Sequence, residues 1–405
     1  GTSDGAGGTW NTVLKNWDQG NALAHVAWVN GSNEAEINGG TQTITLGANI
    51  ILGALTQKAG ASGATINGGS GPYTLTLNVT GANTFQAAAN ATTGRNLTVN
   101  AVIAGGAGKN LVLAGPDTSG TGTITLGGAN TFSGTTTFSA GATSGARVTL
   151  NNRYALQNST VTLSGAANLI FDNAVAANAF TFGALAANGA GTGFNLALQN
   201  DGSVPITLTA GGNQASTTYK GVMSGGGSFI KDGNGTLILT AANTYTGSTT
   251  VIAGTLQVDG SLNSATTVNN GATLAGSGQV NAAVTVAAGG SLVPGAGNLV
   301  VASLSFSGSG SISLGPLSNH TSSAAIGVTG ALSLSGGAGA VTLNLPTAPG
   351  MNGTYRLIQF GSGPADASGF TLGTAPSLAW NQTGTLQVSG GFLNYVITAV
   401  GDTTP

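Results

Sequence analysis

The sequence predicts an all-β protein, a parallel β-solenoid with one cap at its N-terminal end and another at its C-terminal end. Three observations lead to this prediction. Apolar positions recur about every 20 residues between 229 and 334, glycine occupies 70 of the 405 positions, and charged residues make up 5% of the chain. Ordinary globular domains carry about 25% charged residues. Apolar residues still reach 40%, which is enough to build a core and argues against disorder.

Two columns of apolar residues define the repeat. Within each copy apolar and polar residues alternate, as in Thr255-Leu-Gln-Val258, and this period of two places alternate side chains on opposite faces of a strand. Stacking the copies puts like residues above like, with Leu and Val inside and β-branched Thr toward water. The predicted columns are Leu237, Leu256, Leu274, Leu292, Ile312 and Leu332, and Phe229, Val251, Val268, Val286, Phe306 and Val328.

Other architectures fit the pattern less well. Glycine costs about 1 kcal/mol relative to alanine inside a helix, and few windows of this chain lack glycine. Collagen requires glycine at every third position, which is not seen. A β-sandwich stays possible, although its strands would not recur as matched columns.

The predicted solenoid covers residues 46–345, with a Trp-rich cap in 1–45 and a cap or docking segment in 346–405. The end of a solenoid exposes a strand edge and the core, which a cap must cover. A sugar-binding platform is the alternative role for the N-terminal Trp residues. The last segment contains Pro346, Pro349, Pro364 and Pro376, which interrupt strand ladders. Capping or assembly roles are assigned to Trp10, Trp17, Trp28, Tyr355, Phe360 and Trp380.

The segment from Lys231-Asp-Gly-Asn-Gly to Thr255-Leu-Gln-Val258 closely resembles the autotransporter-associated β-strand repeat. Partial copies are Gly127-Gly-Ala-Asn-Thr-Phe-Ser-Gly-Thr-Thr-Thr-Phe138 and Gly81-Ala-Asn-Thr-Phe85. The resemblance is strong over 229–300 and fair over 75–140. It implies a right-handed parallel β-helix displayed outside a bacterial cell.

The motif Asn-Thr-Phe/Tyr occurs at 83–85, 130–132 and 243–245. One interpretation is an exposed stripe of aromatic and amide groups that binds glycans. The favoured interpretation is a turn with an internal stack, because Asn tolerates turn geometry and stacked Asn side chains form ladders. Asn243 and Tyr245 are therefore predicted to belong to the repeat ladder.

The sequence predicts no catalytic, cofactor or metal site. Cysteine is absent, which excludes disulfides and thiolate ligands. Glycoside hydrolysis needs two carboxylates at a defined separation, and stacking could bring distant carboxylates together. Glu34 and Glu36 would share a strand face, which suits either Ca²⁺ or a solvated edge. The candidate carboxylates are Asp117, Asp172, Asp201 and Asp232, and the histidines are His25 and His320.

Charge directs the functional prediction. Nucleic-acid binding needs clustered Lys and Arg, whereas nine basic residues are scattered here and the net charge is −2. No apolar run reaches the roughly 18 residues of a membrane helix, and we expect that an export signal was removed. Low net charge favours association, and end-to-end contacts that do not close give filaments. We therefore expect a non-enzymatic subunit of a self-assembling filament or sheath. The alternatives are a tethered adhesin that binds a glycan or surface ligand, and a polysaccharide-active enzyme.

Overall fold

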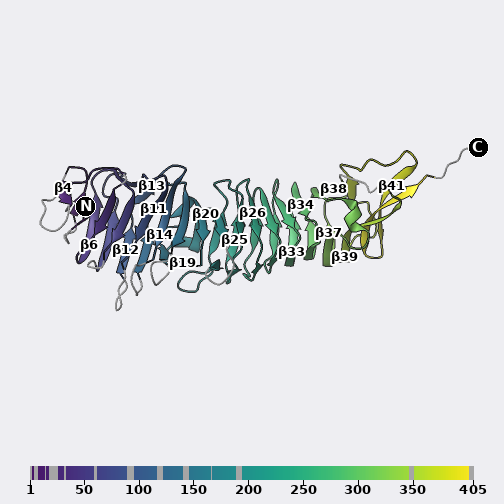
Figure 1. The fold of residues 1–405 in the computed structure, drawn as a ribbon. Helices are drawn as coiled ribbons and strands as arrows, with labels where there is room; N and C mark the ends of the chain where they lie inside the picture. The colour runs from purple at the N-terminus through teal and green to yellow at the C-terminus, as the bar shows by residue number, and fades with distance from the viewer. Residues whose placement is uncertain are drawn as a thin grey trace, which may run out of the picture. The chain divides into compact units, whose positions relative to one another are not determined.

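The computed structural model describes residues 2–3, 8–13, 15–17, 26–31, 33–58, 62–88, 95–115, 122–139, 146–165, 167–187, 194–345 and 351–400. Within these residues the regular structure is strand, apart from short 3-10 turns at Ala176–Asn178 and Leu317–His320. The chain divides into two compact units, Gly1–Gly227 and Ser228–Pro405 (Figure 1). No helical segment in this part of the chain has the length and apolar character that a membrane crossing requires.

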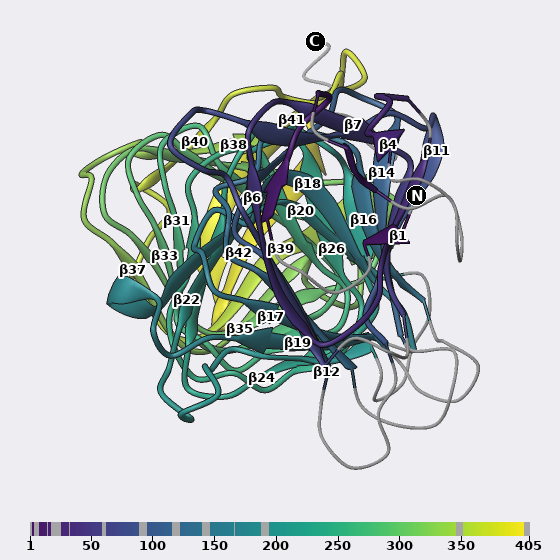
Figure 2. The ribbon, with the colours of Figure 1, turned by 90° about the vertical axis from the view of Figure 1, so that its left-hand side faces the viewer.

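The first unit is built from three ladders of parallel strands, which Figure 2 shows as three walls around an interior. The first ladder contains β1 (Thr2–Ser3), β5 (Glu34–Ile37), β8 (Ala54–Gln57), β11 (Gly81–Gln86), β14 (Lys109–Ala114), β16 (Thr135–Ser139), β18 (Leu156–Leu163), β20 (Ala179–Ala187), β22 (Thr207–Ala210) and β23 (Thr217–Tyr219). The second contains β2 (Gly8–Trp10), β6 (Thr41–Leu46), β9 (Gly63–Asn67), β12 (Arg95–Val99), β15 (Gly122–Leu126), β17 (Ala146–Leu150) and β19 (Ala167–Phe171). The third contains β7 (Ile50–Leu52), β10 (Thr74–Leu77) and β13 (Val102–Ala104).

Two small pairs complete this unit. Strands β21 (Leu196–Ala197) and β24 (Met223–Ser224) are parallel, whereas β3 (Lys15–Trp17) and β4 (Val26–Ala27) are antiparallel.

The second unit repeats the same principle with shorter connections. One ladder contains β26 (Thr236–Leu239), β29 (Thr255–Val258), β32 (Thr273–Gly276), β34 (Gly290–Pro294), β36 (Gly310–Ser313), β38 (Val341–Asn344) and β40 (Phe370–Leu372). The other strands are β25 (Ser228–Lys231), β27 (Ala242–Asn243), β28 (Thr249–Val251), β30 (Ser261–Leu262), β31 (Thr266–Val268), β33 (Gln279–Val286), β35 (Leu299–Phe306), β37 (Ile326–Leu334) and β39 (Gly353–Ser362). The unit ends with β41 (Gln382–Ser389) and β42 (Phe392–Ala399), which pair antiparallel.

Parallel pairing places equivalent residues of successive repeats directly against one another. We call the stretch of chain from one strand to its parallel partner a layer. Leu237 pairs with Leu256, Leu256 with Leu274, and Leu274 with Leu292, and all four side chains are at most 2% exposed. Fully burying a Leu side chain contributes roughly 1.5–3 kcal/mol, so this column is a main source of stability. The prediction of an all-β fold with parallel strands is confirmed.

The predicted columns are wrong at their ends. Ile312 pairs with Leu343 rather than Leu332, and Leu332 pairs with Leu304. The layer that follows Ile312 contains the 3-10 turn Leu317–His320, and this insertion lengthens it beyond the spacing of the earlier copies.

The second column also differs from the prediction at both ends. It begins at Lys231 rather than Phe229, and it continues from Phe306 to Leu334 rather than to Val328. Val328 pairs with Val301.

Parallel pairing occurs on both sides of the predicted boundaries at residues 45 and 345. Strands β1 and β2 pair with later strands of the first unit. Strands β39 and β40 pair in parallel with β37 and β38. Antiparallel pairing is seen in β3–β4 near the start of the chain and in the hairpin β41–β42 near its end.

Candidate interaction surfaces

Two of the N-terminal Trp residues, Trp10 and Trp28, pack inward. Trp10, at the end of β2, is 1% exposed and Trp28 is 4% exposed. Their rings meet edge to face, with centroids 5.1 Å apart and an interplanar angle of 86°. Such buried rings suit a cap and do not offer a sugar the exposed stacking face that a platform needs. The backbone of Trp17 lies in β3, and its side chain falls outside the described residues.

The Asn-Thr-Phe/Tyr motifs face the interior of each unit. Asn83, Asn130 and Asn243 are at most 1% exposed, and so are the aromatic residues Phe85, Phe132 and Tyr245. These motifs therefore form no exposed stripe for a glycan.

The buried Asn residues do not stack on one another, so the expected Asn ladder is wrong. Asn83 pairs with Leu111 and Asn243 with Leu262 in the next layer. Each Asn instead bonds backbone groups, because buried polar atoms need partners. Asn130 Oδ1 accepts from the Ile103 N–H at 2.8 Å, and its Nδ2 donates to the Ala155 carbonyl at 2.9 Å. Asn130 thus links the layer before it to the layer after it.

We expect Asn130→Ala to lower the free energy of unfolding by about 3 kcal/mol, because it strands a buried N–H and a buried carbonyl. The matched control is Asn100→Ala, since Asn100 is exposed and its amide donates to Asn67 Oδ1 at 2.9 Å. Chemical denaturation followed by circular dichroism measures both changes. Equal effects of the two substitutions would contradict the bridging role.

The hydroxyl of Tyr245 begins a buried polar chain. It lies 2.5 Å from Thr249 Oγ1, which lies 2.5 Å from Ser264 Oγ in the next layer. All three residues are fully buried. Burial raises the pKa of Tyr245. In the first unit Thr136 makes the corresponding contact to Ser159 at 2.7 Å, and there Phe132 occupies the place of Tyr245.

The candidate catalytic groups occupy structural positions. Asp172 and Asp201 follow residues that bridge neighbouring layers, Phe171 and Asn200. Asp172 Oδ1 accepts from the Ala174 N–H at 2.8 Å, and Asp201 Oδ1 accepts from the Asn173 N–H at 2.9 Å. Both carboxylates thus order turns. Asp117 and His25 lie outside the described residues.

The other two candidates, Asp232 and His320, also lie apart from one another. Asp232 Oδ1 accepts from the Gly233 N–H at 2.8 Å. His320 is 3% exposed, and burial lowers its pKa. In the part of the chain that the structure describes, no three His, Asp or Glu residues gather closely enough to hold a metal ion.

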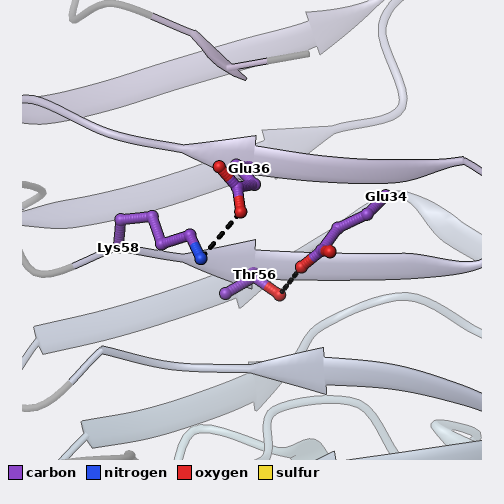
Figure 3. A network of polar contacts seen from close by, with 4 residues as sticks. All are labelled: Glu34, Glu36, Thr56 and Lys58. Carbon is purple, nitrogen blue, oxygen red and sulfur yellow. Dashed lines mark hydrogen bonds and ion pairs between the residues drawn. The ribbon is translucent and has the colours of Figure 1, made fainter. Parts of the chain in front are cut away.

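Glu34 and Glu36 on β5 are engaged by the next strand of their ladder (Figure 3). Thr56 Oγ1 donates to Glu34 Oε1 at 2.6 Å, and Lys58 Nζ lies 2.7 Å from Glu36 Oε1. The two carboxylates therefore have separate partners on β8 and its flank. This arrangement matches the solvated-edge interpretation better than a Ca²⁺ site.

Lys231 is a buried cation that the sequence patterns did not reveal. It is 1% exposed, and its Nζ donates to the carbonyls of Asp232, Gly233 and Ala253 at 2.7, 2.7 and 3.2 Å. Burial lowers its pKa to about 8, against the opposing effect of nearby Asp232. The sequence feature that could have indicated this burial is the Lys-Asp-Gly-Asn-Gly turn, because the carbonyls of Asp232 and Gly233 accept hydrogen bonds from the Lys231 ammonium.

The C-terminal residues divide into buried and exposed groups. Tyr355 is 2% exposed and Phe360 is 7% exposed, whereas Trp380 is 90% exposed. Trp380 lies just before β41. Of these three predicted assembly residues, it alone presents its ring to solvent.

A shallow groove crosses three layers of the second unit. Its volume is about 390 Å³, and it is lined by Gln257, Asp259, Ala275, Gly276, Ser277, Val293, Pro294, Gly295 and Ala296. Gln257 Nε2 donates to Asp259 Oδ2 at 2.8 Å. Asp259 is the charged residue in this lining.

Two comparisons place these features among known proteins. The family model of the passenger-associated-transport-repeat matches residues 118–143 and 229–258. The curated protein "Adhesin BmaC autotransporter" of Brucella suis biovar 1 (strain 1330) is 45% identical over 100 residues. This match covers 22% of the chain but 3% of the adhesin, so the chain spans a small part of that relative. The resemblance drawn from Lys231–Val258 is confirmed, because both matched segments carry this passenger-type repeat.

Proposed function

We propose that this chain is a non-enzymatic, adhesive structural element on the outside of a bacterial cell. Each unit would be a right-handed parallel β-helix, the hand that parallel crossover connections almost always take. The observation that carries the proposal is the unbroken register from Leu237 to Leu292. Such a ladder gives a stiff scaffold whose length grows with the number of repeats.

Self-association is the first function that we propose for this scaffold. No Asp, Glu, Lys or Arg occurs between Asp259 and Arg356, whereas soluble monomers usually spread charge over their surfaces. A second copy could approach this stretch without like-charge repulsion. The chain would then act as a subunit of a filament or sheath.

Adhesion as a tethered monomer is the second candidate. It is supported by the similarity to a protein that is named an adhesin. The groove at Gln257 and Asp259 would suit a neutral glycan, because it offers hydrogen-bonding groups and no cation. An enzymatic role has less support, since Asp172, Asp201 and Asp232 all accept backbone hydrogen bonds in turns.

Sedimentation and negative-stain electron microscopy of the full chain at rising concentration would separate these functions. Self-association predicts larger species that grow with concentration, and uniform fibres if the contact does not close. Monomers at every concentration would refute self-association. Binding of those monomers to a panel of neutral glycans would then support the adhesin, and its absence would count against that candidate too.

A further inference from the structure

The outer edge of β41 is an open strand edge. In the part of the chain that the structure describes, β41 pairs with β42 alone. Asn381 lies opposite Val400 in this pairing. The Val400 N–H donates to the Asn381 carbonyl at 2.7 Å, so Asn381 and Val400 form a hydrogen-bonded pair. Hydrogen-bonded and non-bonded pairs alternate in antiparallel strands, so Gly384, Leu386 and Val388 direct their N–H and C=O groups away from β42.

This edge lacks the features that usually block strand addition. Proteins protect open edges with charged residues, prolines or bulges. Gln382–Ser389 contains neither charge nor proline, and its pairing with β42 is regular over all eight residues. The strand therefore presents a regular, neutral row of backbone donors and acceptors.

Exposed apolar side chains lie at the start of this edge. Trp380 is 90% exposed, Met351 64% and Val400 49%. Hydrogen bonds connect the segments that carry these three residues. Gln382 Nε2 donates to Asn352 Oδ1 at 2.9 Å, and the Val400 N–H donates to the Asn381 carbonyl. Large exposed aromatic groups beside other apolar groups are typical of protein interfaces.

We propose that the β41 edge binds the β41 edge of a second copy of this chain, by antiparallel strand addition about a two-fold axis. This inference rests on the proposed self-association and names its surface. Residues 367–400 contain no charged side chain, so two such edges meet without repulsion, whereas a charged peptide would find no countercharge. An edge strand paired antiparallel with itself is self-complementary, as a two-fold contact requires.

The geometry also accommodates Trp380. A two-fold axis through Thr385 places Trp380 opposite Gly390 of the second copy, because opposed residues lie equally far from the axis. Gly390 and Gly391 form the hairpin turn with φ values of +58° and +78°, and they carry no side chain that would obstruct the ring. A contact of this kind closes on itself, so it gives a dimer and a filament would need a further surface.

Thr385 provides the test. In the full chain, Thr385→Lys sets two like charges opposite each other and is expected to weaken dimerisation at least about tenfold. The control Thr385→Val keeps a good strand residue and should leave dimerisation intact. Sedimentation equilibrium measures both, and circular dichroism confirms that the variants are folded.

A cysteine at the same position gives a second readout. The chain has no cysteine, and Thr385 would face its own copy in a non-bonded pair, where side chains are closest. Thr385→Cys should form a disulfide-linked dimer under mild oxidation, whereas Thr240→Cys, at an exposed position directly after β26, should not.

The outcomes distinguish the two proposals. Loss of the dimer in Thr385→Lys together with the Thr385→Cys cross-link supports strand addition. Oligomers that persist in Thr385→Lys and fail to cross-link through Thr385→Cys overturn the β41 surface but leave self-association standing. A wild-type chain that remains monomeric overturns both.

Discussion

Replacing Lys231 by Met should lower the free energy of unfolding by about 3 kcal/mol at pH 7. The ammonium donates to three carbonyls, those of Asp232, Gly233 and Ala253, and Met fills the space while donating to none. Buried carbonyls without partners are costly. Urea denaturation followed by circular dichroism measures the change. The exposed Lys220→Met is the matched control, and a loss as large as that of Lys231→Met would refute the explanation.

The pH dependence of stability gives an independent readout on the same residue. The pKa of Lys231 falls from 10.5 to about 8 in the folded chain, so between these values the unfolded chain binds more protons. Stability should therefore rise from pH 8 toward pH 10, and this rise should vanish in Lys231→Met. Burial raises the pKa values of Tyr245 and Tyr395. Ionisation of these tyrosines in the unfolded chain then lowers stability above pH 10, so the decisive range is pH 8 to 9.5.

Leu274→Ala should lower the free energy of unfolding by about 3 kcal/mol, within the usual range for buried Leu. Leu274 lies between Leu256 and Leu292 in adjacent layers, and all three are fully buried. Their backbones are fixed by the ladder, so the cavity cannot collapse. Thermal and urea unfolding of the full chain would measure the loss.

The control for this substitution is Thr273→Ala on the same strand. Thr273 pairs with Thr255 and Ser291 and is partly exposed on the outer face, so its change should stay within about 0.5 kcal/mol. If Leu274→Ala and Thr273→Ala were equally mild, the column would not be a main source of stability.

The sequence predicted the register correctly wherever successive layers have nearly equal length. Leu237 to Leu292 and Val251 to Phe306 are examples, because a constant spacing in the sequence becomes direct pairing in space. The prediction failed after Ile312, where the insertion with the 3-10 turn hides the true partner Leu343. Spacing alone cannot show how much of a long layer loops outward.

The interior polar groups could be predicted only in part. The placement of Asn243 and Tyr245 inside the unit follows from their recurrence with the repeat, but their partners do not. Asn243 donates to the carbonyls of Ala241 and Ser261. The residue paired with it in the next layer is Leu262 rather than another Asn. Lys231 was missed because a lysine in a strand is normally a surface residue. The antiparallel hairpin β41–β42 has no repeat to reveal it.

The insertion after Ile312 shows how such a protein can diversify. Ile312 and Leu343 stay paired although 31 positions separate them, whereas 18 separate Leu274 from Leu292. The interior thus tolerates a change of more than ten residues in the length of one connection. Gene duplication could add whole layers and recombination could exchange their outer loops, while each new layer still finds its neighbours through the same inward side chains. Sequence variation in the exposed loops is thereby separated from the buried residues that stabilise the fold.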